Sequence, residues 1–382
     1  MNAIDRLRLL SSQMHLEPAE DAQCPQLSAR KQDEVHISSA ALPNGKRITM
    51  LKTLLTSACE RNCYYCPFRA ERDFRRATFR PDEFASLFMY LHKTGAAEGI
   101  FLSSGVFGGG IRTQDQLLAT AEILRRRYQY QGYLHLKIMP GAEKAQLEQA
   151  MRLADRVSVN LEAPNDARLQ KLAPKKHFLE ELMQPLRWAA EIRKEQSPHL
   201  AWKGRWASTV TQFVVGAVGD TDVELLSTTE NLHRHTGLSR AYFSAFNPIS
   251  DTPLEDHAPT PLIRQNRLYQ ASFLVRDYGF TLEDLPFAGE GNLPLDTDPK
   301  TAWAQAHLQE HPLEINRASR EELLRIPGIG PKSVDIILNA RRERRLSDLS
   351  VLGKLGILAQ RAAPFILLDG KRPERQLVFA GW

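Results

Sequence analysis

Long apolar runs are missing from this sequence of 382 residues, and cysteine is scarce, with four residues. No stretch approaches the roughly 20 consecutive apolar residues that cross a membrane. The first residues, MNAIDRLRLLSSQMHLEPAED, carry charges throughout and lack the apolar core of a secretory signal peptide. These absences argue against a membrane protein and against a secreted disulfide framework. We therefore expect a cytoplasmic monomer with no membrane partner.

Basic charge is unevenly distributed along the chain. The formal net charge is +5, and residues 314–382 alone carry 13 Lys and Arg against 8 Asp and Glu. The rest of the chain is therefore balanced, and the whole excess lies in the last fifth. A small basic domain on a neutral body predicts a surface that binds a polyanion. A solvated helix face would show the same charge, so both interpretations remain open at this point.

From Ile48 onward, apolar runs typical of strands alternate with amphipathic stretches typical of helices. This alternation predicts an α/β fold in which helices cover a parallel sheet. Six units predict a barrel or a partly closed one, since a full eight-stranded barrel needs about 250 residues. The predicted strands are 48–56, 99–104, 133–139, 156–162, 208–216 and 240–247, and the predicted helices are 81–95, 113–129, 143–155, 178–195 and 261–285.

Composition also predicts where the domains begin and end. We expect an N-terminal extension at 1–45, formed by a short helix and a loop, and a barrel at 46–290. A stretch dense in Pro and Gly predicts a linker at 291–312. A small all-α domain at 313–372 and a tail at 373–382 complete the chain.

Three of the four cysteines, Cys59, Cys63 and Cys66, lie within eight residues, directly after the first predicted strand. Neighbours this close do not form a useful disulfide, so the spacing indicates a metal site. Thiolates suit both iron–sulfur clusters and zinc. A four-iron cluster with three protein ligands keeps one iron open for another ligand. Structural zinc needs a fourth donor, for which Cys24 and His36 are available, so zinc stays an alternative, as do unliganded cysteines.

The pattern Cys59-x-x-x-Cys63-x-Tyr65-Cys66 resembles the signature of the radical S-adenosylmethionine (SAM) superfamily. The resemblance implies a partial (β/α)6 barrel, which agrees with the six units counted above. It implies a [4Fe-4S] cluster and SAM as cofactors, with SAM cleaved to a 5′-deoxyadenosyl radical that takes hydrogen from a substrate. An electron donor such as flavodoxin or ferredoxin would then be a partner.

The same resemblance implies which residues contact SAM. The end of the second strand usually carries a Gly-Gly-Glu run, from which this chain departs with Ser103, Ser104 and Gly105. On the fourth strand, Asn160 and Glu162 share one face with Ser158, because strand side chains alternate. Strands of parallel barrels are usually apolar on both faces, so polar side chains on the inward face of this strand indicate a bound ligand. The alternative is a buried polar pair whose members hydrogen-bond to each other. The predicted SAM contacts are Tyr65, Ser103, Ser104, Gly105, Asn160, Glu162 and Gly216.

Two further polar groups have two open interpretations each. His135 and Lys137 on the third strand either reach the barrel mouth or line a solvated edge. Four arginines at 69, 72, 75 and 76 either contact a phosphate or the cofactor carboxylate, or form a solvated face.

The segment Ile326-Pro-Gly-Ile-Gly-Pro-Lys332 lies between two helical stretches and resembles a helix-hairpin-helix (HhH) motif. Its glycines allow a tight turn whose amides point outward beside a helix N-terminus, a geometry that cradles phosphate. Ser319 and Glu322 fit the cap of the entry helix. A protein-docking version of the fold is the alternative. The predicted nucleic-acid contacts are Gly328, Ile329, Gly330, Lys332, Arg341 and Arg342, with Arg325, Arg344 and Arg345 adding charge.

A faint repeat aligns Leu355–Ala362 with Pro327–Val334, and the second copy has lost one glycine and the lysine. We therefore expect the first hairpin to bind and the second mainly to pack. The order of motifs over about 45–370 resembles bacterial radical SAM proteins assigned to DNA modification or repair. The leading hypothesis is radical chemistry on DNA. The alternatives are a radical SAM enzyme that modifies RNA, such as tRNA, and a non-catalytic DNA-binding protein with a structural metal.

Overall fold

The computed structural model describes residues 2–11, 14, 35, 37–41 and 45–373. The chain divides into two compact units. The first holds the described residues up to Asp220 together with Asn231–Pro261, and the second holds Thr221–Glu230 and the described residues from Leu262 on. Each unit is described by itself below.

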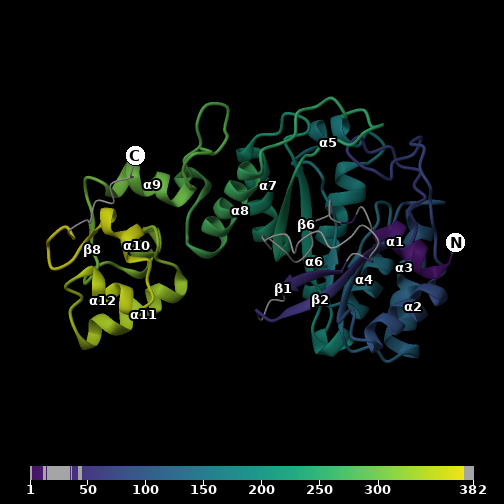
Figure 1. Ribbon diagram of the computed structural model, residues 1–382, viewed down its shortest axis with the longest axis horizontal. Coiled ribbons are helices and arrows are strands. Elements are labelled where there is room, and N and C mark those ends of the chain that lie inside the picture. The colour runs from purple at the N-terminus through teal and green to yellow at the C-terminus, as the bar shows by residue number, and fades with distance from the viewer. Residues whose placement is uncertain (1, 12–13, 15–34, 36, 42–44, 374–382) are drawn as a thin grey trace. The chain divides into compact units, whose positions relative to one another are not determined.

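One curled sheet forms the framework of the first unit (Figure 1). Its seven strands lie side by side in chain order, and the last six run parallel to one another. All six predicted strands are therefore confirmed, as is the half-barrel expected from them. The strands are β1 (Ile37–Ala41), β2 (Arg47–Leu54), β3 (Gly99–Ser103), β4 (Tyr133–Lys137), β5 (Arg156–Ser158), β6 (Ser208–Val215) and β7 (Arg240–Ala245).

The first strand, β1, corrects the predicted extension, which was expected to contain only a helix and a loop. It pairs antiparallel with β2, with Ile37 opposite Leu51. Its sequence, ISSAA, is short and weakly apolar, so no strand pattern marks it. Backbone hydrogen bonds to the edge of β2 stabilise β1 as a strand, although its own sequence does not indicate one.

Helices follow the strands as predicted, and each packs an apolar face inward. Helix α2 begins at Pro81, a residue suited to a first turn, and buries Phe84 and Phe88. Two helices were not predicted, α5 and α7; α5 has only seven residues and α7 is largely polar. The helices are α1 (Ala3–Ser11), α2 (Pro81–Lys93), α3 (Gly110–Glu122), α4 (Lys144–Leu153), α5 (Asp166–Leu172), α6 (Gln184–Glu195) and α7 (Asp222–Thr236).

Strands of this sheet are buried on both faces, as parallel sheets usually are. Every residue of β3 is buried, and β6 is buried from Thr209 on. Polar side chains buried near the carboxyl ends of the strands are the exception to this apolar interior. They include Ser103, Ser104, Lys137, Asn160, Glu162 and Gln212. Ligands of open α/β sheets bind at that edge, so the exception locates a candidate site.

The second unit is mainly helical. Its core joins Ala304 and Leu308 to the apolar residues of the hairpin region, such as Ile329 and Ile337. The helices are α8 (Leu262–Asp277), α9 (Pro299–Leu308), α10 (Arg320–Arg325), α11 (Pro331–Glu343), α12 (Leu349–Lys354) and α13 (Ala359–Ala362).

Two expectations for this part of the chain need correction. The stretch 291–312 contains α9, so much of the predicted linker is folded against the hairpin core. The domain expected to be all-α also contains a short parallel pair, β8 (Leu313–Glu314) with β9 (Ile366–Leu367). That pair ties the two ends of the hairpin domain together, which apolar periodicity in two-residue strands cannot reveal.

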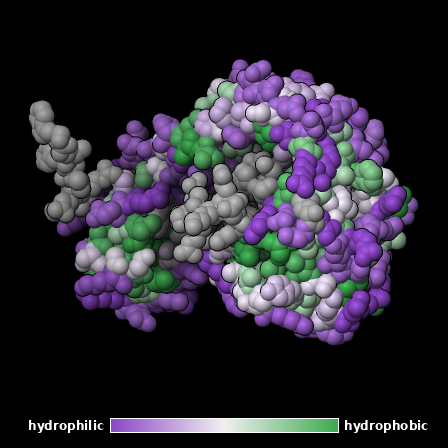
Figure 2. Space-filling view, turned by 45° about the vertical axis from the view of Figure 1, so that its right-hand side comes forward, coloured by the Kyte–Doolittle hydropathy of each residue, from purple (hydrophilic) through white to green (hydrophobic). Residues whose placement is uncertain are grey.

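Among the described residues, no helix is long and apolar enough to cross a membrane. In the view of Figure 2, hydrophobic patches on the surface are interrupted by hydrophilic residues and form no continuous belt.

Candidate functional site

A pocket opens at the carboxyl ends of the sheet strands in the first unit. All three clustered cysteines line it, together with residues of β2, β3, β4, β6 and β7 and residues that follow β5. Six of the seven predicted SAM contacts share this pocket: Tyr65, Ser103, Ser104, Gly105, Asn160 and Glu162. Nine residues predicted from the sequence, spread over about a hundred positions, therefore line one cavity.

Arg76 holds the loop that carries the cysteines. Its guanidinium donates hydrogen bonds to four backbone carbonyls, those of Ser57 (2.6 Å), Phe68 (3.1 Å), Arg69 (2.8 Å) and Arg72 (3.3 Å). These carbonyls flank the cysteines on both sides. These four carbonyls all accept hydrogen bonds from the one Arg76 side chain. The loop is therefore held in place without a regular helix or strand.

The four arginines between 69 and 76 therefore have unequal surroundings. Arg72, like Arg76, serves the loop: it donates to the Pro67 carbonyl at 2.9 Å and to the Ser250 carbonyl at 3.1 Å. Arg69 lies over the Tyr64 ring, and Arg75 is exposed. The interpretation as one phosphate-binding group is not supported for Arg72 and Arg76, because their donors are used locally.

The three thiols are unbridged and lie in an environment that opposes ionisation. Burial raises the pKa of Cys63, and burial together with the neighbouring Cys63 raises the pKa of Cys66. The Lys176 ammonium acts in the opposite direction on the pKa of both thiols. Thiolates here therefore need a cationic partner, and a metal centre is the usual one.

This donor set fits a [4Fe-4S] cluster better than a single ion. No three His, Cys, Asp or Glu side chains in the described part of the chain converge on one point that could hold a metal ion. In a four-iron cluster each thiolate binds a different iron, so three cysteines that line one pocket suffice without converging on a single point. The extra zinc donors considered above, Cys24 and His36, lie outside the described residues.

Glu162 and Lys176 form a buried ion pair in the pocket. Lys176 Nζ lies 2.9 Å from Glu162 Oε1, and the two side chains are 8% and 5% exposed. Burial alone would raise the pKa of Glu162, but Lys176 and Lys137 lower it. Burial alone would lower the pKa of Lys176, but the charges of Cys63 and Glu162 raise it. Both members are therefore charged at neutral pH.

Only one of the two carboxylate oxygens of Glu162 accepts a hydrogen bond. Its second oxygen, Oε2, is buried and accepts no hydrogen bond of ordinary geometry, although the Tyr65 hydroxyl is close enough to lower the Glu162 pKa. Glu162 also has a φ of 65°, a left-handed conformation that is rare for a side chain of this kind. A strained residue with a free buried acceptor is suited to receive a ligand donor.

Asn160 and Glu162 do not pair with each other, and each has a protein partner of its own. The Asn160 amide donates to Gln212 Oε1 on β6, at 3.3 Å. Gly105 serves a different purpose: a Cβ there would lie 2.3 Å from the Ala58 carbonyl oxygen. Only glycine lets the end of β3 pass this close to the cysteine loop.

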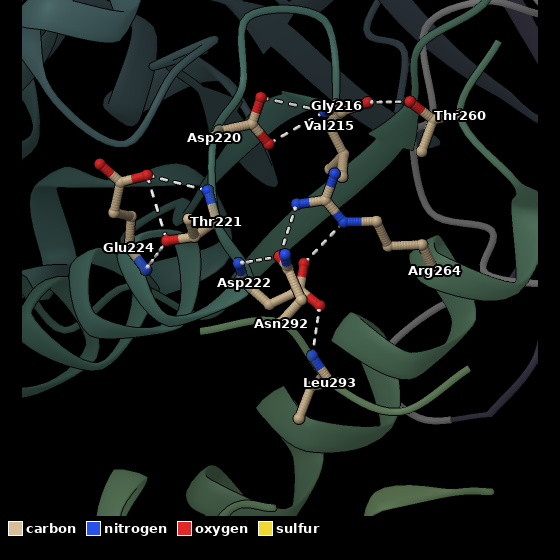
Figure 3. Close-up of polar contacts among 10 residues, drawn as sticks. All are labelled: Val215, Gly216, Asp220, Thr221, Asp222, Glu224, Thr260, Arg264, Asn292 and Leu293. Atoms are coloured by element: carbon tan, nitrogen blue, oxygen red, sulfur yellow. Dashed lines mark hydrogen bonds and ion pairs between the residues drawn. The ribbon is translucent and has the colours of Figure 1, made fainter. Parts of the chain in front are cut away.

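Gly216 is the predicted contact that the structure places elsewhere. It is not among the residues that line the pocket, and its amide donates to both Asp220 carboxylate oxygens, at 3.0 and 2.9 Å (Figure 3). Its φ of 87° makes the turn after β6 possible. The glycine-rich stretch thus forms a local turn, and a SAM contact by Gly216 remains a prediction.

A second polar network in Figure 3 belongs to the other unit. The Asp222 carboxylate, fully buried, binds Arg264 Nε at 2.8 Å and the Leu293 amide at 2.9 Å. The Asn292 side chain accepts from the Asp222 amide at 3.1 Å and from Arg264 at 3.3 Å. Every partner is satisfied, so this network fixes the start of α7 and offers no free group for chemistry.

Sequence reasoning missed Lys176 and Gln212 as pocket residues and left Lys137 open. Gln212 lies on a predicted strand, where its polarity in the run STVTQFVV was an available signal. Lys176 follows α5 in a loop that has no periodicity and contains another lysine beside it, so no pattern could distinguish it.

In the second unit, the structure forms the predicted hairpin between α10 and α11. Gly328 turns the chain with a φ of 84°, and Gly330 caps α11 with φ −111° and ψ 176°. The predicted capping box of Ser319 and Glu322 is present at α10. The left-handed position is therefore the first glycine, while Gly330 provides space beside the helix start.

The predicted contacts of the hairpin divide into outward and inward groups. Lys332 and Arg342 are exposed, as a phosphate contact requires. The Ile329 side chain is buried in the core, so only its backbone can face a ligand. Arg341 donates to the Ala318 carbonyl at 2.7 Å, and Arg325 pairs with Asp284 at 2.9 Å. For Arg341 and Arg325 the structure indicates a packing function, because their donors point inward.

The aligned second hairpin has the same turn but a different tip. Gly356 has a φ of 76° and Ile357 is buried, like Gly328 and Ile329. Leu358 stands where the first copy has Gly330, and its side chain is 60% exposed. The helix that follows, α13, has only four residues. This copy therefore lacks both the open approach and the helix start of the first.

Two family models match the chain. The one described as the radical SAM superfamily matches residues 53–228, which contain the cysteine loop and strands β3 to β6. The one described as a helix-hairpin-helix motif matches residues 312–340, which contain α10 and α11. No curated protein matches the sequence.

Several solved structures are similar to the chain. The FeFe-hydrogenase maturase HydG from Carboxydothermus hydrogenoformans is 15% identical with a TM-score of 0.47, and the match covers 59% of this chain and 51% of that one. Methylornithine synthase (PylB) is 14% identical with a TM-score of 0.45, covering 58% and 62%. The radical SAM methyltransferase TsrM from Kitasatospora setae is 16% identical with a TM-score of 0.40, covering 57% and 39%. This chain thus spans 39% to 62% of these proteins.

Proposed function

We propose that this chain is a radical SAM enzyme that modifies or repairs DNA, since residues 53–228 match the radical SAM model and residues 312–340 match a helix-hairpin-helix motif. The observation that carries the proposal is the first hairpin. Its exposed Lys332 and its glycine-capped α11 start suit the phosphate backbone of a nucleic acid. The basic excess of residues 314–382 supports the same ligand.

The cofactors of this class are a [4Fe-4S] cluster and SAM, which together supply a 5′-deoxyadenosyl radical. In this chain Cys59, Cys63 and Cys66 would hold the cluster, since they are unbridged and line one pocket. Glu162 would accept hydrogen bonds from SAM through Oε2, and Asn160 and Ser103 line the same pocket. An electron donor such as flavodoxin or ferredoxin would supply the electron.

The ion pair of Lys176 and Glu162 would orient the carboxylate that receives SAM. Lys176 binds Oε1, and Oε2, which has no hydrogen-bond partner, would be left for the ligand. The strand ends at the pocket are buried, and a site enclosed in this way would protect a reactive radical from side reactions. A base in a stacked duplex cannot reach such a pocket, so the target nucleotide would be flipped out or single-stranded.

Anaerobic reconstitution with iron, sulfide, reductant and SAM tests this proposal. Duplex DNA, single-stranded DNA and tRNA would be added separately, and 5′-deoxyadenosine release would be measured by chromatography. We expect DNA to stimulate release above the substrate-free rate. Stimulation by tRNA alone would show an RNA-modifying enzyme, and an iron-free protein that binds DNA without cleaving SAM would contradict the enzymatic proposal.

A further inference from the structure

A lysine is buried beneath the first hairpin. Lys300 lies in the first turn of α9 and is 9% exposed. Its Nζ donates to the Ile329 carbonyl at 2.5 Å and lies 4.6 Å from the centre of the Tyr278 ring. Lysine is almost never this buried without a carboxylate partner, so its position calls for a reason.

The carbonyl that Lys300 holds is the one between the two glycines of the hairpin. In a trans peptide the carbonyl and the following amide point in opposite directions, and none of the described peptide bonds is cis. Because the Ile329 carbonyl is held inward by Lys300, the Gly330 amide points outward. That amide makes no hydrogen bond among the described residues.

We propose that Lys300 is the positioning residue of the hairpin, holding the Ile329 peptide so that the Gly330 amide is aimed at a DNA phosphate. The proposal rests on the proposed function, since it deepens the DNA site of that function. A phosphate oxygen hydrogen-bonded to Gly330 would lie roughly 7–8 Å from Nζ across the peptide. At that distance through protein, the ammonium also attracts the phosphate directly.

Protonation of Lys300 should make DNA affinity depend on pH. Burial lowers the pKa of Lys300 to about 7, with Asp298 raising it and Arg361 lowering it further. The groups packed around Nζ are the Tyr278 ring, whose own pKa is raised by burial, and Asp298, which is paired with Arg361 at 2.8 Å. A bound phosphate would raise the Lys300 pKa. DNA binding then takes up a proton, and affinity falls as the pH rises above about 7.

The test compares the full-length protein with Lys300→Met, which keeps the chain length and loses the donor and charge. Exposed Lys354→Met controls for the loss of any positive charge from the same unit. We expect Lys300→Met to lose about tenfold in duplex affinity. Its affinity should also lose the wild-type pH dependence between 6 and 9, which one proton limits to about tenfold per pH unit. Lys354→Met should keep that dependence.

A second measurement works without DNA and without a variant. Glycine-selective ¹⁵N labelling of the full chain gives one amide signal per glycine, 22 in all. The Gly330 signal should titrate with a midpoint near the Lys300 pKa of about 7. An amide that does not titrate, or a Lys300→Met affinity and pH profile equal to wild type, would overturn the proposal. Absence of DNA binding by wild type would instead contradict the proposed function, while the amide titration still tests Lys300.

Discussion

Glu162 shows what single residues reveal from sequence and what they do not. Alternation on one predicted strand identified Asn160 and Glu162, and both line the pocket. Lys176, which pairs with Glu162, comes from an irregular loop, and only the folded chain brings it there. Sequence patterns report residues whose spacing matches a helix or strand, and Lys176 has no such spacing.

The cysteines carry the first prediction at this scale. Replacing Cys59, Cys63 or Cys66 with Ala should abolish the broad visible absorption of the reconstituted protein, because each removes one of three thiolate ligands. Wild type should hold about four irons and four sulfides per chain. Cys24→Ala is the matched control and should keep both. Loss of absorption in Cys24→Ala would contradict a cluster with three cysteine ligands.

The ion pair carries a stability prediction. Lys176→Met should destabilise the metal-free protein by roughly 3–5 kcal/mol, because it leaves the Glu162 charge buried without compensation. Urea unfolding measures this directly. The double variant Lys176→Met/Glu162→Gln should recover most of the loss, since neither charge then remains. Equal stability of the single and double variants would show that the two side chains do not interact.

The free oxygen of Glu162 carries a binding prediction. Glu162→Gln keeps the size of the side chain but replaces one carboxylate oxygen with an amide, so SAM affinity should fall by about tenfold with the cluster retained. Asn160→Ala should weaken binding less, because Gln212 already occupies its amide. Equilibrium dialysis against labelled SAM measures both. Unchanged affinity in both variants would assign this wall of the pocket to substrate or to structure.

At the scale of elements, strands were more predictable than short helices. The six parallel strands coincide with mostly apolar runs of the sequence, and each was found within a few residues, although β5 itself has only three. Helix α5 has seven residues, and β8 and β9 have two each, so their packing partners rather than their own sequences determine them.

Comparison of the two hairpins predicts which substitutions would let the second one bind DNA. Leu358 occupies the place of Gly330, and Gln360 the place of Lys332. Leu358→Gly/Gln360→Lys should therefore raise DNA affinity and steepen its salt dependence, since a second loop can then approach phosphate. Gly330→Leu should lower affinity. Fluorescence anisotropy at several salt concentrations measures both, and unchanged affinity in the double variant would show that the second hairpin faces away from DNA.

At the scale of the whole molecule, the helix-hairpin-helix match falls in the second unit, and the radical SAM match falls in the first except for residues 221–228. The order of motifs predicted this arrangement, but it did not predict that α9 belongs with the hairpin core. The Pro and Gly content of 291–312 indicated a linker, yet Ala304 and Leu308 are buried there. A few apolar residues with a tertiary partner outweigh local composition.

Separate units predict separable activities. Lys332→Ala should weaken DNA binding equally for all sequences and reduce the magnitude of the log–log salt slope by about one, because one phosphate contact is lost. Cleavage of SAM without DNA should stay at the wild-type rate, while DNA-stimulated cleavage at low DNA concentration should fall. A fall in the DNA-free rate would mean that the hairpin also supports the cofactor pocket.

The exposed Leu358 also bears on how such an enzyme would find its target. A protein that holds DNA through one phosphate-binding loop, rather than two, dissociates sooner from each position it samples. Short residence on undamaged or unmodified DNA favours hopping between sites over long pauses. Leu358, at the tip of the second hairpin, would thus increase the rate at which the protein samples DNA sites and lower its affinity for each site.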